Sequence, residues 1–253
     1  MFDKKLLILI LDSCRYDTFV QAKTPNFDKV GKVMPALTRS NHTSGSFGSF
    51  FMTFHFPAVD DYELNRKVRQ FLIYYCRKKK LRLWSGMPLF FPSWGGVHKL
   101  DVLDELKFNN KSHCAMDFVK PEKFFDKFKI EVVWAGETHW PFEVNTGDTE
   151  FNQEDHIKYR QGKYKFPQEH LDYLKSRQVD MIEYCDKRFG EWKIPKDTMV
   201  IITADHGEAF GEQGYFGHGH GFIREMFEVP LVVRGIEDQY SKLSKFMPSV
   251  LWK

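Results

Sequence analysis

TADHGEAFGEQGYFGHGH, residues 203–220, is the most distinctive stretch of this chain. It follows a short apolar run, Met199 to Ile202, which predicts a buried strand bounded by polar residues and glycines. Asp205 and His206 therefore lie where a strand ends and a loop begins, and ligands bind at that edge of an open α/β sheet. The alternative is a glycine-rich surface loop with solvated histidines. The other segments of the chain are needed to distinguish a ligand-binding site from such a loop.

Two other apolar runs also end close to side chains that can bind a metal. Leu6 to Leu11 is continuously apolar, as expected of a central strand covered on both faces, and it leads into Asp12. Ile130 to Ala135 is a second predicted strand, and His139 follows it. If these strands share a sheet edge with the strand before Asp205-His206, their ends form a cage of carboxylates and imidazoles. That set suits a divalent cation such as zinc or manganese better than calcium or a thiolate-seeking metal.

The remaining segments alternate between predicted helices and predicted strands. The longest helical pattern runs from Pro167 to Trp192, with these expected inward positions: Leu171, Leu174, Val179, Ile182 and Phe189. Shorter helices are predicted over Thr24 to Val30 and Pro121 to Phe128. Residues 143–165 are polar without periodicity and are interpreted as an irregular excursion that could serve as a lid. The alternation predicts one α/β domain over residues 1–253, with a mostly parallel central sheet flanked by helices.

Composition narrows the class of protein. The chain has 253 residues, 42% of them hydrophobic and 28% charged, which indicates a globular domain. Its net charge of +3 is too small to indicate a nucleic-acid partner. No segment is long enough to span a bilayer, the first apolar run ends in Asp12 without a signal-peptide cleavage site, and the four cysteines are scattered. We therefore expect a cytoplasmic protein without a membrane anchor, a disulfide framework or a structural zinc site.

Thr43 is the candidate nucleophile. It falls at or just before the first turn of a helix predicted by the hydroxyl-rich stretch that begins at Thr38. A free hydroxyl is a poor nucleophile at neutral pH, but a cation and a positive helix N-terminus both stabilise its alkoxide. The alternative is that Thr43 simply caps the helix.

The surrounding pattern favours the nucleophile. In TSGSFGSFFMT, residues 43–53, Thr43, Ser46 and Ser49 have the register of the Txx[ST]xx[ST] nucleophile segment of sulfatase-like hydrolases. The chain resembles that family, within the alkaline phosphatase superfamily, in four further segments that occur in the family's order and extend over most of its length. These are LILILDSCRYDTF (7–19), TPNFDKV (24–30), GETHWPFE (136–143), and TADHGEAF through EVPLVV (203–233).

The resemblance implies a role for each matching position. The implied metal ligands are Asp12, Thr43, Asp205 and His206. The implied catalytic residues are Thr43 as nucleophile, with His139 and His218 at the non-bridging or leaving-group oxygens. His218 is preferred to His220 because its distance to Glu225 keeps the family's register.

Three further residues are candidate substrate contacts: Arg15, Asn41 and His220. Arg15 could order the Asp12 loop or touch the anion, and a structural ion pair with Asp17 or Glu208 is the alternative.

The departures from the family pattern refine the chemistry. Sulfatases oxidise a cysteine or serine to formylglycine, which Thr43 cannot form, so phosphoryl transfer is favoured over sulfate-ester hydrolysis. The Asp-x-x-x-His pair of two-zinc phosphatases is missing because Ala135 lies four residues before His139, which favours one Zn or Mn ion, with a second ion as the alternative. The chain also ends soon after Val233, so the family's C-terminal subdomain is expected to be absent or minimal.

The function implied by the resemblance is hydrolysis of a small phosphate or phosphonate ester, with Thr43 as covalent nucleophile. A phosphotransferase that uses an alcohol acceptor and a sulfuric-ester hydrolase are alternatives with the same site. A non-catalytic metal-binding interaction protein is disfavoured because a decayed site tends to lose a ligand or its nucleophile.

Overall fold

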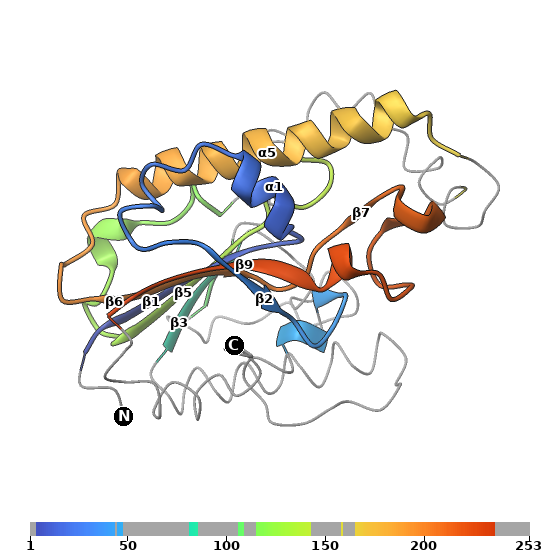
Figure 1. The fold of residues 1–253 in the computed structure, drawn as a ribbon. Coiled ribbons are helices and arrows are strands. Elements are labelled where there is room, and N and C mark those ends of the chain that lie inside the picture. The colour runs from blue at the N-terminus through green and yellow to red at the C-terminus, as the bar shows by residue number, and fades with distance from the viewer. Residues whose placement is uncertain are drawn as a thin grey trace.

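The computed structural model describes residues 4–43, 45–47, 81–85, 106–108, 115–142, 158 and 165–235. Its core is a seven-stranded sheet with the strand order β2-β9-β6-β1-β5-β3-β4 (Figure 1). The strands are β1 (Leu6–Leu11), β2 (Met34–Leu37), β3 (Leu81–Ser85), β4 (Leu106–Phe108), β5 (Ile130–Ala135), β6 (Met199–Ala204) and β9 (Glu228–Arg234). The pairs among β6, β1, β5, β3 and β4 are parallel, and β9 is antiparallel to β6 and β2. The expected α/β fold with a mostly parallel sheet is confirmed.

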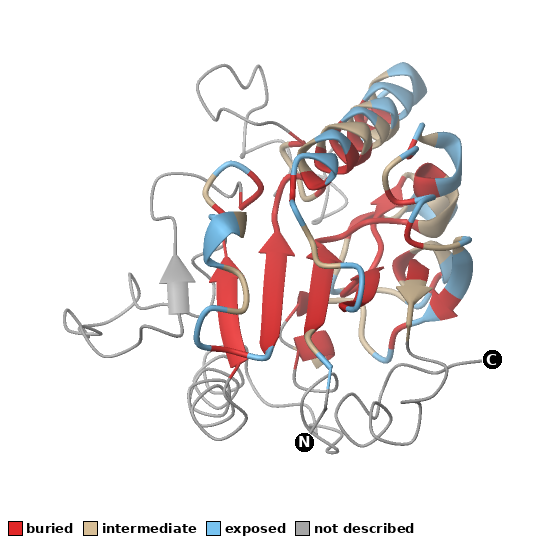
Figure 2. Ribbon diagram, turned by 90° about the vertical axis from the view of Figure 1, so that its left-hand side faces the viewer, coloured by how far each residue is buried: buried red, intermediate tan, exposed pale blue. Residues whose placement is uncertain are grey.

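The three strands at the centre are the ones predicted from apolar runs, and Glu131 of β5 and Thr203 of β6 are the polar residues within them. Every residue of β1, β5 and β6 is buried, as expected of strands covered on both faces (Figure 2). Leu11 pairs with Ala135 of β5 and with Ala204 of β6. The strands therefore end at the same level, and the residues that follow them start at one edge of the sheet.

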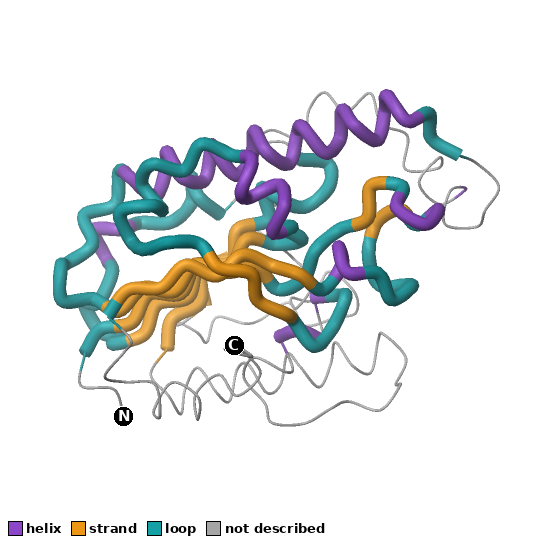
Figure 3. Tube along the Cα trace, in the orientation of Figure 1, coloured by secondary structure: helices purple, strands orange, loops and turns teal. Residues whose placement is uncertain are grey.

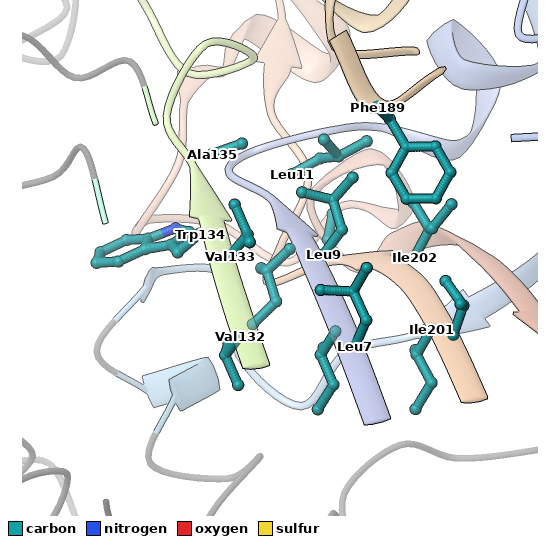
Figure 4. Packing of buried hydrophobic residues seen from close by; sticks show 14 of the residues in the cluster. Leu7, Leu9, Leu11, Val132, Val133, Trp134, Ala135, Phe189, Ile201 and Ile202 are labelled. Carbon is teal, nitrogen blue, oxygen red and sulfur yellow. The ribbon is translucent and has the colours of Figure 1, made fainter. Parts of the chain in front are cut away.

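Two helices lie over one face of this sheet, α1 (Tyr16–Gln21) and the long α5 (Gln168–Gly190) (Figures 1 and 3). The inward side of α5 adds Ile182, Cys185 and Phe189 to the core. In Figure 4, Phe189 lies next to the side chains of the central strands. Burial of this apolar face fixes α5 on the sheet.

Two predicted helices are wrong. Residues 25–30 form successive turns, and the Asp186 carboxylate of α5 accepts hydrogen bonds from the backbone N–H groups of Asn26 (3.0 Å) and Phe27 (2.7 Å) at the start of this segment. The predicted helix from Pro121 is only a 3-10 turn, Pro121–Lys123. Short α1 was not expected from the sequence.

The segment after β6 contains small elements that lie beside the site. These are β7 (Ala209–Phe210), a 3-10 turn at Glu212–Gly214, β8 (Phe216–Gly217) and a 3-10 turn at Arg224–Met226. Apart from residues 158 and 165, the predicted excursion over 143–165 lies outside the described residues. Among the helices that the structure describes, none is both long and apolar enough to cross a membrane.

Candidate active site

Asp12, Asp205 and His206 come together just beyond the carboxyl ends of β1 and β6. One potential ligand atom from each lies within 4.8 Å of the others, and all three residues are fully buried. Nε2 of His206 is 3.8 Å from Oδ1 of Asp12 and 3.5 Å from Oδ2 of Asp205. Adjacent parallel strands with aligned ends produce this convergence, since Asp12 and Asp205 each follow the last residue of their strand.

The chemistry of this cluster fits a divalent cation. Oδ2 of Asp12 and Oδ2 of Asp205 are buried and have no hydrogen-bond partner among the described residues. Burial, and then the neighbouring Asp205 carboxylate, raise the pKa of Asp12 well above its usual value. Burial likewise raises the pKa of Asp205. Two buried carboxylates with unsatisfied oxygens are costly unless a cation neutralises them, and the O, O, N donor set suits zinc or manganese.

The His206 ring is neutral, and its Nε2 is available to bind a metal. Its Nδ1 lies 2.8 Å from the carbonyl oxygen of Gly207, which can only accept, so the proton is on Nδ1 and the lone pair is on Nε2. Burial lowers the pKa of His206 to about 3, so the ring stays uncharged at neutral pH. Gly207 is required here because a Cβ at that position would lie 1.9 Å from the carbonyl oxygen of Glu225.

Thr43 reaches the same cluster from a distant part of the chain. Its Oγ1 is 3.1 Å from Nε2 of His206, and the residue is buried. Thr43 and residues 45–47 are helical, and the N–H of Ser46 donates to the carbonyl of His42 (3.1 Å), so Thr43 lies in the first turn. Gly45 is needed because a Cβ there would lie 2.2 Å from Oγ of Ser40.

Ser13 connects the two carboxylates and was not singled out by the sequence. Its φ of 58° lies in the left-handed region, which is unusual for serine. In this conformation its N–H donates to Oδ1 of Asp205 (3.1 Å) and its hydroxyl donates to Oδ1 of Asp12 (3.1 Å). Ser13 therefore holds one oxygen, Oδ1, of each carboxylate.

Two further histidines lie next to His206. The His218 ring centroid is 4.4 Å from that of His206 and 5.2 Å from that of His139. Nδ1 of His218 is 3.1 Å from Oε1 of the buried Glu208, whereas Nδ1 of His139 is 2.6 Å from the carbonyl of Trp140. The two rings therefore have different partners, a carboxylate for His218 and a peptide carbonyl for His139.

The three predicted substrate contacts have structural partners. The Arg15 guanidinium binds both carboxylate oxygens of Asp17 (2.7 and 2.8 Å) and Oε1 of Glu212 (2.6 Å). The structural ion pair with Asp17, given above as the alternative for Arg15, is therefore present. With Glu208, Arg15 contacts the backbone carbonyl (3.2 Å) rather than the side chain.

Asn41 and His220 hold the histidine-rich loop. The side-chain amide of Asn41 donates to the carbonyl of Gly221 (2.9 Å), and the backbone carbonyl of Asn41 accepts from the N–H of Gly219 (2.8 Å). Nδ1 of His220 lies 2.9 Å from the carbonyl of His218. These bonds join the Thr43 segment to the loop that carries His218. Substrate contacts by Asn41, His220 and Arg15 stay predictions.

Sequence reasoning missed the buried Gln178 of α5. Val179 was expected to face inward, but it is half-buried and Gln178 is fully buried instead. The helical spacing could have indicated that Gln178 faces inward, since it lies four residues after Leu174 and four before Ile182, both of which are buried.

Comparisons with known proteins agree with this architecture. No family profile matches the chain. Over 77 residues the chain is 34% identical to the multifunctional alkaline phosphatase superfamily protein PehA from Trinickia caryophylli, a match that covers 27% of this chain and only 14% of PehA.

Two solved structures are similar over most of the chain. The C-terminal periplasmic domain of phosphoethanolamine transferase EptC from Campylobacter jejuni has a TM-score of 0.55 at 16% identity, over 96% of this chain and 83% of that one. Phosphonate monoester hydrolase from Agrobacterium radiobacter has a TM-score of 0.56 at 15% identity, over 91% of this chain and 68% of that one. The chain thus has the sulfatase-like fold of the alkaline phosphatase superfamily, as its motifs predict. The threonine-nucleophile subtype stays a prediction.

Proposed function

We propose that this protein is a metal-dependent hydrolase of phosphate or phosphonate esters in which Thr43 is the covalent nucleophile. The observation that carries the proposal is the position of the Thr43 hydroxyl, 3.1 Å from Nε2 of His206 in a buried cluster with Asp12 and Asp205. A hydroxyl in the first turn of a helix, beside carboxylates that would hold a cation, lies where both the helix N-terminus and the bound cation would stabilise its alkoxide.

The ligands would be Asp12, Thr43, Asp205 and His206, and one Zn or Mn ion is our proposal for the cofactor. When bound, the ion would supply positive charge that lowers the pKa of the Thr43 hydroxyl and stabilises the negative charge on the transferring group. Ser13 would keep Asp12 and Asp205 oriented, and the Gly207 carbonyl would hold His206 with its Nε2 toward them.

In the proposed reaction, the Thr43 hydroxyl loses its proton to solvent, and its Oγ1 attacks phosphorus opposite to the leaving oxygen. A Thr43 O–P bond forms, the bond from phosphorus to the leaving oxygen breaks, and the leaving oxygen takes up a proton. Water then hydrolyses the phosphothreonine, which releases the product and restores the Thr43 hydroxyl.

His218 is the proposed proton donor to the leaving group. The carboxylate of Glu208 at its Nδ1 orients the ring and stabilises the positive charge that it carries while protonated at both nitrogens. The carbonyl at Nδ1 of His139 fixes that ring's tautomer but offers a charged ring much less stabilisation. We therefore assign proton donation to His218 and orientation of a non-bridging oxygen to His139.

A second candidate function keeps the site and changes the acceptor. Similarity in fold to the phosphoethanolamine transferase EptC favours a transferase in which an alcohol, rather than water, takes the group from Thr43. Product analysis with and without an added alcohol separates the two functions, because only a transferase makes the new ester as its main product.

The proposed function is tested with aryl phosphate monoesters, phosphate diesters, phosphonates and sulfates, each with Zn²⁺, Mn²⁺ or a chelator. The expected result is metal-dependent release of the aryl alcohol from a phosphate or phosphonate ester, and mass spectrometry of the quenched protein should detect the group on Thr43. Turnover of sulfates alone, or equal turnover in chelator, would contradict the proposal.

A further inference from the structure

We infer that Gln178 of α5 is a positioning residue for the metal site, although it touches none of the proposed ligands. The expected effect of Gln178 on kcat rests on the proposed function. The expected effect of Gln178 on metal affinity does not depend on which ester is hydrolysed. Its amide joins α5 to the loops that follow β1 and β5, the two loops that carry Asp12 and His139.

The Gln178 amide makes a complete set of hydrogen bonds. Nε2 donates to the carbonyls of Ser13 (2.9 Å) and Thr138 (3.1 Å). Oε1 accepts from the hydroxyl of Thr18 (2.7 Å) and from the N–H of Arg15 (3.4 Å). The side chain is 0% exposed. An amide has two donors and two principal acceptor sites, so each of them is used.

The first connection from Gln178 reaches both carboxylates through Ser13. The left-handed backbone of Ser13 is costly for a residue with a Cβ and persists only where its surroundings hold it. Gln178 holds the Ser13 carbonyl, while the N–H and hydroxyl of the same residue hold Asp205 and Asp12. Loss of the Gln178 donor would let the Ser13 peptide rotate and both carboxylates shift.

The second connection from Gln178 runs through Thr138, the residue before His139. Nε2 of Gln178 binds the Thr138 carbonyl, and the Thr138 hydroxyl donates to the carbonyl of Asp12 (2.7 Å). The two loops are thus bound to each other and to one buried amide. Since α5 is packed on the sheet by Ile182 and Phe189, the amide is held by a rigid element.

Glutamine is specifically suited to this position. Glutamate has the same shape, but its ionised form only accepts and would oppose the carbonyls of Ser13 and Thr138. Methionine has a similar length and makes neither bond. The variants Gln178→Glu and Gln178→Met therefore remove the donors with little change of volume.

Asp186→Asn provides a matched control on the same helix. Asp186 is also a buried polar residue of α5, but it binds the backbone of Asn26 and Phe27, about 12 Å along the helix from Gln178. Its replacement should lower stability without changing the metal site.

The test measures the dissociation constant of Zn²⁺ or Mn²⁺ for each apoprotein by competition with a chromophoric chelator, beside the metal-free unfolding midpoint. We expect both Gln178 variants to bind metal about 10- to 100-fold more weakly, as for other residues that orient ligands, and Asp186→Asn to bind as the wild type. With an ester that the wild type hydrolyses at saturating metal, kcat should fall about tenfold while KM changes less, because the affected groups act in the transition state.

Wild-type metal affinity in a folded Gln178→Glu or Gln178→Met protein would overturn the inference, as would an equal loss of affinity in Asp186→Asn. If neither variant folds, Gln178→Asn keeps the amide on a shorter side chain, and wild-type affinity in it would overturn the inference equally. A wild type that binds metal but hydrolyses no ester would disprove the proposed function and leave the affinity comparison valid.

Discussion

The hydroxyl oxygen of Thr43 lies 3.1 Å from Nε2 of His206, although 163 residues separate the two along the chain. Because Nδ1 of His206 donates to the carbonyl of Gly207, Nε2 is the acceptor and the Thr43 hydroxyl is the donor in this metal-free arrangement. Oδ2 of Asp205 is 3.5 Å from the same nitrogen. A hydroxyl, a neutral imidazole and a carboxylate thus meet in one small buried volume.

Replacing Thr43 should separate catalysis from metal binding. We expect Thr43→Ala to lower kcat by at least about 10³-fold, because the proposed covalent intermediate forms on the Thr43 hydroxyl, while the metal dissociation constant changes by less than about tenfold. Thr43→Ser is the matched control, since it keeps the hydroxyl and should keep measurable turnover. Full activity in Thr43→Ala would disprove the proposed mechanism.

Asp12→Asn should stabilise the metal-free protein while it damages the metal site. Asparagine carries no charge, so it avoids both the cost of burying the Asp12 carboxylate and its repulsion from Asp205, and the free energy of unfolding in chelator at pH 8 should rise. Metal affinity should fall by at least about 100-fold because a charged ligand is lost. Denaturant unfolding with chelator and a metal titration check the two effects, and a less stable apoprotein would contradict the expected repulsion.

The role of His218 can be tested by varying the leaving group. We expect His218→Asn to lower kcat about 10²-fold for an ester of a weakly acidic alcohol and far less for a nitrophenyl ester, whose leaving oxygen needs no proton. Glu208→Gln should show the same dependence in weaker form, because the carboxylate that supports the ring is lost. Equal losses for all leaving groups would assign His218 to binding rather than to proton donation.

Glu137, at the end of β5, should make stability depend on pH. Its carboxyl is fully buried, its Oε1 accepts from the N–H of Met116 (2.7 Å), and burial raises its pKa from 4.5 to about 7. The folded protein therefore holds the proton more tightly than the unfolded chain, and the stability gained from it is complete below pH 4.5 and lost as the pH rises through 7.

Glu137→Gln removes this pH dependence. Relative to the variant, the wild type should lose roughly 3 kcal/mol of unfolding free energy between pH 4.5 and pH 8. Denaturant unfolding of both proteins in chelator across that range measures the difference. Parallel pH profiles for the two proteins would show that the Glu137 carboxyl titrates normally in the fold.

Much of the fold was predictable because its centre is built from local patterns. The runs at 6–11, 130–135 and 199–204 are apolar except at Glu131 and Thr203, and predominantly apolar runs of this length form buried strands in α/β folds. The turns at 25–30 were mistaken for a helix, because proline after threonine begins turns as well as helices.

The sequence by itself determined which residues end the central strands, and so it singled out Asp12 and Asp205 before any contact was known. Strand order, the left-handed backbone of Ser13 and the inward rotation of Gln178 were decided only by the tertiary structure. The physical reason is that local patterns report which residues avoid water. The partner of a buried polar group depends on which distant segment supplies it, as Gln178 does for Ser13 from 165 residues away.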